Sequence, residues 1–242
     1  MLSSKNSHIR DKDIKFYEQG HIYNVKGDTS FTSVTTWVKK KFKKFDSDVI
    51  IDKMMNSNKW ENSIYYGKTK KEIKDIWKQN GIIASNAGTY MHKMIEDYYN
   101  NIDMDESVIG TFEYNSFLDY LQHNKHLVPY RTEWMVYDER KKISGSIDMI
   151  YINADGTISI YDWKRCKKMD KVNAFNEYSI DKDYEDIPDT NYWHYSLQLN
   201  MYKHIIEDNY GFKVKELKLV VIHPEFNNTY KIVDVPFINK KF

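Results

Sequence analysis

The spacing of apolar residues changes from a helical period to an alternating one after Pro129. Apolar residues at helical spacing predict helices at residues 33–42, 46–57, 70–79, 82–100, 107–123 and 192–210. Alternating runs predict strands at residues 132–138, 142–152, 157–163, 217–222 and 230–235, with a further strand and turn at 21–31. The polar stretch 167–190 is expected to be mainly loop. This order predicts an α/β (α+β) fold in which helices flank a central mixed sheet.

Two local signals bear on how the chain is divided. Thr69 and Glu72 have the spacing of a capping box, in which the hydroxyl and the carboxylate accept hydrogen bonds from amides at the start of a helix. Asn80-Gly81 is a pair that commonly ends a helix, so a second helix is expected directly after it. We therefore expect an N-terminal strand and helical elaboration, residues 1–81, that roofs a core of residues 82–242.

The segment from Asn153 to Gly156 suits a three-residue hairpin loop, with Gly156 in the left-handed region. Such a loop pairs Asn153 with Thr157 and fixes the register of the two strands. It places four pairs opposite one another on one face: Ile152 with Ile158, Ile150 with Ile160, Asp148 with Asp162, and Ser146 with Lys164. That face is expected to be apolar near the turn and acidic at its far end.

Asp148 and Asp162 at opposite positions of an antiparallel pair would repel each other, since their Cβ atoms would lie about 4.5–5.5 Å apart. A divalent cation removes this repulsion, because carboxylate oxygens from adjacent strands can converge on Mg²⁺ or Mn²⁺. Lys164 on the same face adds a cation that orients or deprotonates a water, or stabilises the charge of a phosphate. The alternative is that both aspartates are solvent-exposed strand ends that pair with nearby lysines.

The formal charge of the 242-residue chain is only +1, so its overall field does not indicate a nucleic-acid partner. Any such binding must come from local clusters. There are two, consisting of Lys39, Lys40, Lys41, Lys43 and Lys44, and of Lys164, Arg165, Lys167, Lys168 and Lys171. A solvated surface is the ordinary interpretation of such a run, but the second one begins inside the candidate motif.

The single cysteine, Cys166, excludes an internal disulfide and a four-cysteine metal site, and it indicates a reducing compartment. The first twenty residues are polar, and no apolar run approaches the length of about 18 residues that a membrane span needs. We therefore expect a soluble intracellular protein with no membrane partner. The excess of lysine over arginine is typical of an AT-rich coding genome, such as that of a virus or an organelle.

Three motifs occur in order along the chain. They are Gly145-Ser146-Ile147-Asp148, a strand that ends Asp162-Trp163-Lys164, and Gln198-x-x-x-Tyr202 on a helix. Together they resemble the PD-(D/E)XK nuclease superfamily, in particular its RecB-like exonuclease branch, to which the mitochondrial genome maintenance exonucleases belong. The segment from Gly88 to Glu96 is similar to the helix that supplies a histidine ligand in that branch. The resemblance covers about residues 84–222 and implies a restriction-endonuclease-like core.

By this resemblance, the protein ligands of the metal are His92, Asp148, Asp162 and the backbone carbonyl of Trp163. Lys164 would position the attacking water, and the cofactor would be Mg²⁺ or Mn²⁺.

Gln198 and Tyr202 would contact the substrate strand or support the lysine. Glu96 is either a hydrogen-bonding partner of the ligands or a surface acid. Glu133 could face the same site, but alternation counted from Pro129 does not decide its direction.

The sequence also departs from the family pattern. No proline precedes Asp148, and the second acidic residue of the motif, Asp162, is not a glutamate. The cysteines that hold an iron–sulfur cluster in several relatives are missing, so the resemblance implies a member without an iron–sulfur cluster.

The implied function is a metal-dependent DNA nuclease, an exonuclease that prefers single-stranded ends and acts in repair or recombination, with replication or recombination proteins as partners. Lysines and aromatics at residues 33–79 suit a roof that admits a single strand. Three alternatives remain. They are an RNA or DNA endonuclease of the same fold, a non-catalytic nucleic-acid-binding module, and a sugar hydrolase in which Asp148 and Asp162 act as acid and base and Lys164 has no role.

Overall fold

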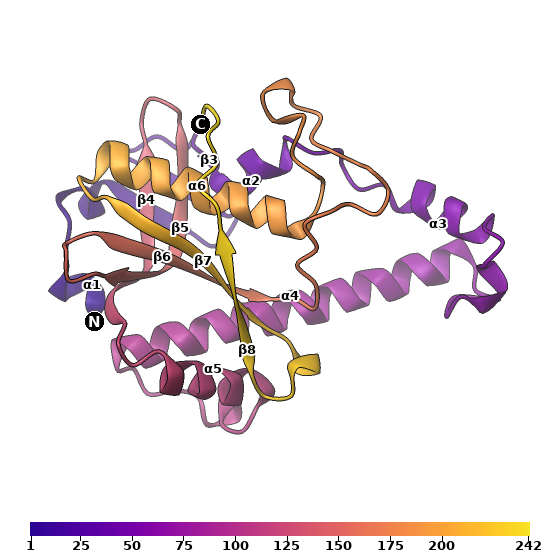
Figure 1. Ribbon diagram of the computed structural model, residues 1–242, viewed down its shortest axis with the longest axis horizontal. Coiled ribbons are helices and arrows are strands. Elements are labelled where there is room, and N and C mark those ends of the chain that lie inside the picture. The colour runs from indigo at the N-terminus through magenta and orange to yellow at the C-terminus, as the bar shows by residue number, and fades with distance from the viewer.

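The computed structural model describes residues 1–242 and contains six α-helices, a mixed six-stranded sheet and a two-stranded hairpin (Figure 1). The helices are α1 (Leu2–Lys5), α2 (Val34–Lys39), α3 (Ser47–Met55), α4 (Lys70–Asn100), α5 (Phe112–His123) and α6 (Asn191–Asn209). The strands are β1 (Ile14–Tyr17), β2 (Ile22–Val25), β3 (Thr32–Ser33), β4 (Val128–Asp138), β5 (Ile143–Ile152), β6 (Ile158–Arg165), β7 (Val214–Ile222) and β8 (Tyr230–Val235). The predicted α/β class is confirmed. None of the helices has the length and apolar character that crossing a membrane requires.

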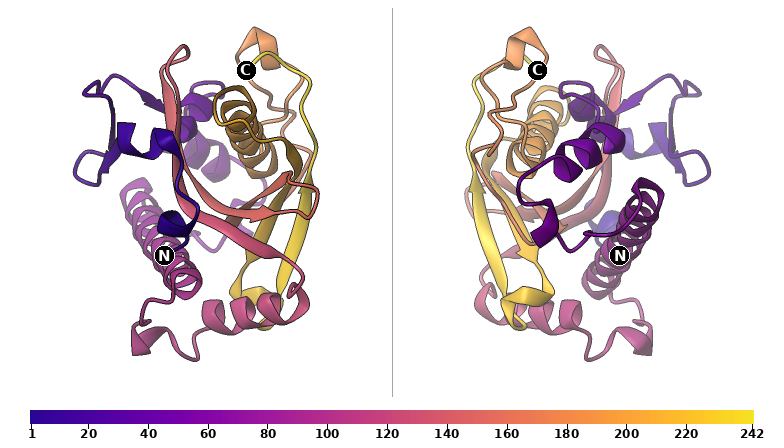
Figure 2. Two further views of the ribbon diagram at one scale, coloured as in Figure 1. Left: turned by 90° about the vertical axis from the view of Figure 1, so that its left-hand side faces the viewer. Right: turned by 90° about the vertical axis from the view of Figure 1, so that its right-hand side faces the viewer.

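The main sheet has the spatial order β4, β5, β6, β7, β8, and the short β3 lies beside the first part of β5. β5 pairs antiparallel with β4 and β6, β6 pairs parallel with β7, and β7 pairs antiparallel with β8. Parallel neighbours need a crossover connection, and α6 supplies it between β6 and β7. The sheet curves around α6, while α4 and α5 cover its other face (Figure 2).

Alternation along the strands divides the core between these two faces. Ile160 and Leu219 belong to the cluster that packs against α6. Tyr161, Trp163 and Val220 belong to the cluster that packs against α4 and α5. Each of these side chains is almost fully buried, and burial of a large apolar side chain contributes about 1.5–3 kcal/mol. The central strands are therefore held firmly from both sides.

Helix α4 is one continuous helix of 31 residues, so the predicted break at Asn80-Gly81 is wrong. Its predicted start is confirmed, because the Thr69 amide donates to the Glu72 carboxylate at 2.7 Å and the Glu72 amide donates to Thr69 Oγ1 at 3.3 Å. A glycine inside a helix costs only about 1 kcal/mol relative to alanine, which 31 residues of helix readily offset. The helix thus crosses the boundary that we expected between residues 81 and 82.

The first part of α4 extends beyond the rest of the molecule, and α3 lies beside its far end (Figure 1). Ion pairs join the two helices, with Lys74 Nζ 2.7 Å from Asp48 Oδ1 and Lys70 against Asp52. We call α3 together with residues 70–90 of α4 the arm. It includes part of residues 33–79, the segment that was expected to roof the site.

The predicted hairpin between β5 and β6 is confirmed. Asn153 N–H donates to Thr157 O at 2.8 Å, and Gly156 has a φ of 80°. Ile150 lies opposite Ile160, as the turn geometry requires. At the acidic end of the hairpin, however, the expected pairing is absent.

The ladder between β5 and β6 ends at Met149 and Tyr161, so Asp148 and Asp162 are not a cross-strand pair. The predicted pairing of Ser146 with Lys164 is absent for the same reason. Beyond this point β5 pairs with β3, whereas β6 continues beside β7. We call the point of divergence, between Asp148 and Asp162, the strand fork.

The N-terminal segment is attached directly to the core sheet. The Asp11 carboxylate accepts a hydrogen bond from Arg131 Nη1 and another from Trp134 Nε1, both at 2.8 Å. Arg131 also donates to the backbone oxygen of Asn6 at 2.9 Å. Residues near the N-terminus therefore brace β4, the strand that carries Glu133.

Candidate metal centre and active site

His92, Glu133 and Asp148 come together beside the strand fork from α4, β4 and β5. His92 Nδ1 lies 3.5 Å from Asp148 Oδ2 and 3.7 Å from Glu133 Oε1. One ligand atom from each residue lies within 4.8 Å of the other two. Neighbouring ligands of an octahedral ion stand about 3 Å apart and opposite ones about 4 Å. The three partly buried side chains therefore form a group that could hold a metal ion.

Glu133 is directed into this group by an unusual backbone conformation. Its φ is 43°, in the left-handed region, and such a residue in the middle of a strand costs about 1–3 kcal/mol. The conformation reverses the alternation of β4: Thr132 hydrogen-bonds to Asn100 of α4, whereas Trp134 packs in the cluster around α6. Alternation counted from Pro129 could not have found this direction, because the count is broken twice, by the register shift between Pro129 and Arg131 and by the left-handed backbone of Glu133.

The neighbours of Glu133 keep its carboxylate at the site. Ser146 Oγ donates to Glu133 Oε2 at 2.8 Å across the β4–β5 pair. The partners on either side are Thr132 with Met149 and Trp134 with Ile147, so Glu133 lies beside Asp148 in the sheet. Strain of this kind gathers at functional positions, which favours Glu133 as a ligand.

Asp162 belongs to a second group, on the α6 side of the fork. Its side chain is 1% exposed, and Oδ1 accepts a hydrogen bond from Gln198 Nε2 at 3.1 Å. Oδ2 forms an ion pair with Lys164 but accepts no well-directed hydrogen bond. Lys164 Nζ also lies 4.8 Å from the centre of the Tyr195 ring. The structure therefore groups Asp162 with Lys164 and Gln198 rather than with the His92 triad.

Asp148 links the two groups across the fork. Its Oδ2 accepts a hydrogen bond from the backbone N–H of Trp163 at 2.9 Å. Trp163 thus reaches the site through its backbone, while its indole is buried on the α4 side. A role for its carbonyl as a ligand stays a prediction.

The charges at the fork are poorly balanced without a cation. Burial raises the pKa of Asp148 above its ordinary value, and His92 and Lys164 offset this effect only in part. Burial and the charge of Asp148 raise the pKa of Asp162 to about 6. A divalent cation would favour ionisation of both carboxylates, so the donor set fits such an ion.

The negative charge of the carboxylates also raises the pKa values of His92 and Lys164. Burial lowers the pKa of His92, but the carboxylates of Asp148 and Glu133 outweigh it and raise the pKa to about 9. Burial likewise disfavours charge on Lys164, yet Asp162 and Asp148 hold its pKa above the ordinary value. Lys164 is therefore an ammonium group at neutral pH.

Tyr202 lies against the glycine of the first motif. A Cβ atom on Gly145 would stand only 2.7 Å from Tyr202 Oη and 2.8 Å from its Cε1. Tyr202 is 3% exposed and packs in the cluster around α6. In this arrangement Gln198 fixes Asp162, and Tyr202 packs against β5 just before Asp148.

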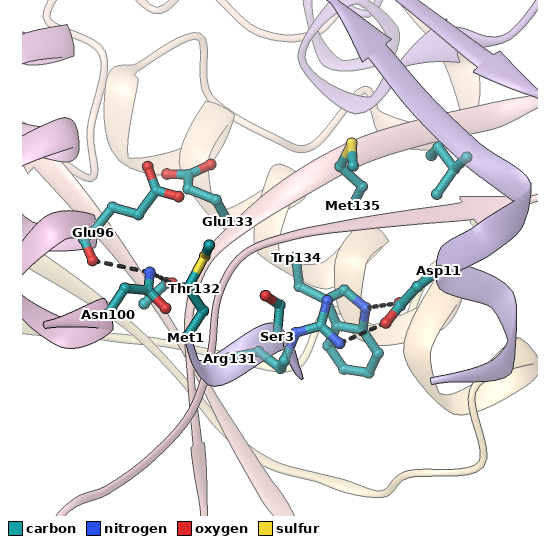
Figure 3. A pocket seen from close by; sticks show the side chains of 11 residues that line it. Met1, Ser3, Asp11, Glu96, Asn100, Arg131, Thr132, Glu133, Trp134 and Met135 are labelled. Carbon is teal, nitrogen blue, oxygen red and sulfur yellow. Dashed lines mark hydrogen bonds and ion pairs between the residues drawn. The ribbon is translucent and has the colours of Figure 1, made fainter. Parts of the chain in front are cut away.

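Glu96 lies behind the triad, where α4, β4 and the N-terminal residues enclose a pocket of about 200 Å³ (Figure 3). The carboxylates of Glu96 and Glu133 point toward one another there. Burial and the charge of Glu133 raise the pKa of Glu96. Glu96 is thus a neighbour of a candidate ligand.

In the two basic runs of the sequence, some side chains form ion pairs within the protein and others are exposed without one. Lys41 is buried, lies 2.7 Å from Asp181 Oδ2 and stands over the rings of Trp37 and Tyr184. Arg165 and Lys167 are each 2.7 Å from a glutamate oxygen, in Glu113 and Glu225. The exposed lysines that form no ion pair are Lys39, Lys40, Lys43, Lys44, Lys168 and Lys171.

A scan against known protein families finds no family that matches the chain, and a search of curated proteins finds no significant relative. The function of the protein is therefore inferred from the arrangement of side chains at the fork.

Proposed function

We propose that the protein is a divalent-metal-dependent nuclease of the RecB-like PD-(D/E)XK type, with a restriction-endonuclease-like core, that hydrolyses phosphodiester bonds in DNA. The observation that carries this proposal is the convergence of two groups at one strand fork. The first is the His92–Glu133–Asp148 triad, and the second is the buried Asp162–Lys164 pair. A sugar hydrolase would need the carboxylates but would leave this lysine without a role.

Each group has a distinct task in this proposal. When bound, Mg²⁺ or Mn²⁺ supplies a Lewis acid that lowers the pKa of a water and neutralises charge on the phosphate. Asp148 and His92 offer ligand atoms on the α4 side, and Glu133 adds a third. Asp162, which is fixed by Gln198, keeps the Lys164 ammonium at the fork. There the ammonium can orient the attacking water and stabilise the negative charge that develops on the phosphate oxygens.

We further propose single-stranded DNA ends as the substrate. The long arm carries lysines and the exposed Tyr90, and the exposed Phe45 and Tyr66 lie in the segments that adjoin it. Aromatic and positively charged side chains of this kind suit a flexible strand better than a duplex. Linear single-stranded DNA is then degraded from an end, and covalently closed single-stranded circles are spared. Cleavage of closed circles at the rate of the linear form would identify an endonuclease instead.

The first experiment is a cleavage assay with end-labelled single- and double-stranded DNA and RNA in Mg²⁺. Asp148→Asn, Asp162→Asn and Lys164→Ala should each abolish cleavage, because each removes a charge that the reaction uses. Asp155→Asn is the matched control, since this exposed aspartate lies in the turn at the other end of the same hairpin. DNA binding and the circular dichroism spectrum should persist in all four variants. Full activity in a folded Asp148→Asn variant would refute the assigned site.

The second experiment tests whether His92 and Glu133 bind the metal. His92→Ala and Glu133→Gln should weaken Mn²⁺ binding in calorimetry and lower activity in both Mn²⁺ and Mg²⁺. Mn²⁺ should support activity at least as well as Mg²⁺ in the wild type, because imidazole nitrogen suits the softer ion better. Unchanged metal affinity in both variants would remove the triad from the proposal.

A further inference from the structure

A cavity of about 560 Å³ separates the residues before and within α3 from the start of α6. Lys43, Lys44 and Lys53 line it on the α3 side. Asn191 and His194 of α6 line it on the other. None of these residues belongs to the metal centre.

The three lysines have no partner inside the protein, because none of them forms an ion pair. Two of the three acids in the cavity are already engaged. Asp46 caps α3 by accepting from the amides of Asp48 and Val49, and Asp189 lies 2.8 Å from His194 Nε2. Both aspartates keep their charge, and with Glu177 the lining carries three carboxylates and three ammonium groups. Because none of the three lysines is paired with an acid, each ammonium group is free to contact an anion.

Exposed aromatic and apolar side chains accompany these ammonium groups: Phe45 and Ile50 line the cavity, and Phe175 and Tyr178 lie close to Glu177 in the sequence. Phe45 is 66% exposed and Ile50 is 38% exposed on the α3 side. On the loop that contributes Glu177, Phe175 is 84% exposed and Tyr178 is 46% exposed. Flat apolar surfaces next to ammonium groups match a strand whose bases stack and whose phosphates are charged.

The cavity also lies close to the strand fork along α6. His194, Gln198 and Tyr202 are spaced at intervals of four residues, so they lie on one face of α6. Four residues of helix rise by about 6 Å. The cavity is therefore one helical turn from Gln198, the residue that holds Asp162.

We propose that this cavity is the entry subsite for a single DNA strand on its way to the fork. Lys43, Lys44 and Lys53 bind its phosphates, and Phe45 and Phe175 stack on its bases. The strand then continues past Tyr195, the half-buried neighbour of His194 in α6, whose ring lies 4.8 Å from Lys164 Nζ at the fork. The identity of the ligand rests on the proposed nuclease function, but its binding is measurable without cleavage.

The test is fluorescence anisotropy with a labelled oligothymidylate in Ca²⁺, over a range of NaCl concentrations. For single strands, log K changes with log salt by about 0.7 for each phosphate contact, so the Lys43→Ala/Lys44→Ala/Lys53→Ala variant should lower the slope by about 2. The matched control is Lys12→Ala/Lys15→Ala/Lys125→Ala, which removes three exposed lysines that form no ion pair and lie outside this cavity. The control should keep the wild-type slope and affinity.

Phe175→Ala separates stacking from charge. This side chain is 84% exposed, so its removal does not disturb the core. Affinity should fall by about 5- to 150-fold, the range for loss of one stacked base, while the salt slope stays at the wild-type value. A blunt duplex of the same length should not compete with the labelled strand.

An unchanged slope in the cavity triple variant, or an equal loss in the control, would overturn the entry subsite. Equal competition by the duplex would overturn its preference for a single strand. These outcomes are distinct from failure of the nuclease proposal, which would appear as absence of metal-dependent cleavage by a protein that still binds the strand through these lysines.

Discussion

Gly145→Ala tests the packing that holds β5 at the strand fork. The new Cβ would meet Tyr202 Oη at 2.7 Å and Cε1 at 2.8 Å, both shorter than any ordinary contact. Tyr202 is buried in the cluster around α6, so its ring cannot swing into solvent. Either β5 or the ring must shift.

Overpacking of this kind costs about 1–3 kcal/mol. For a chain of this size each kcal/mol lowers the melting temperature by about 2–4 °C, so the expected fall is about 2–12 °C. Gly88→Ala is a matched control of opposite sign. It places the same methyl group in α4 with no atom within 4 Å, and it should stabilise the protein by about 0.5–1 kcal/mol because alanine is the better helix former.

The assay is thermal unfolding of Gly145→Ala in the wild-type background and in a Tyr202→Phe background. Tyr202→Phe removes the hydroxyl contact but keeps the ring contact, so it should recover part of the loss. The two substitutions should therefore be coupled rather than additive. A melting temperature for Gly145→Ala equal to that of the wild type, or an equal penalty in both backgrounds, would refute this explanation of the motif glycine.

Three further outcomes are expected at other sites. Lys41→Met should lower the free energy of unfolding by about 1–3 kcal/mol in a urea titration, because it leaves Asp181 without its charged partner; no loss would mean that Lys41 is an ordinary surface lysine. Glu133→Gly should raise stability by about 1 kcal/mol by relieving the left-handed backbone while metal binding is lost, and a destabilised variant would contradict the strain. Because the pKa of His92 is about 9, metal binding at pH 7 must release its proton, so affinity should rise about tenfold per pH unit up to about pH 9, with one proton released in calorimetry; pH-independent affinity would exclude His92 as a ligand. Without metal, the stability of the fold has the opposite pH dependence. The stabilisation that protonated His92 contributes is complete below pH 6.5 and is lost as the pH rises through about 9.

The hairpin and most of the helices and strands were predicted from the sequence because they depend on local chemistry, whereas α1 and β1 were not predicted. The Thr69 cap, the turn ending at Gly156 and the limits of β8 are all as predicted. The Gly81 break was wrong because the cost of one glycine is small beside the cooperativity of a long helix. A signal such as Asn80-Gly81 concerns two residues, whereas the stability of the helix depends on the contributions of all 31 residues.

The centre of the site was harder to predict because it depends on where regular structure stops. Extending the hairpin register past Met149 paired Asp148 with Asp162, but strand divergence ends the ladder first. Glu133 was undecided because its left-handed backbone interrupts the alternation on which a prediction must rely. The contact of Gln198 with Asp162 arises only through tertiary packing of α6 on the sheet, which no local pattern records.

The pairing of β3 with β5 also sets an order of events during synthesis. Thr32 and Ser33 leave the ribosome long before Ile143 and Ser144, their partners in the sheet. At about 5–20 residues per second, the first strand waits roughly 5 to 20 seconds for the second. During that interval its amides and carbonyls have no native strand beside them, and Asp11 has no Arg131 to bind. The nascent chain therefore cannot complete the fork from its N-terminal end, and closure of the site is a late step in folding.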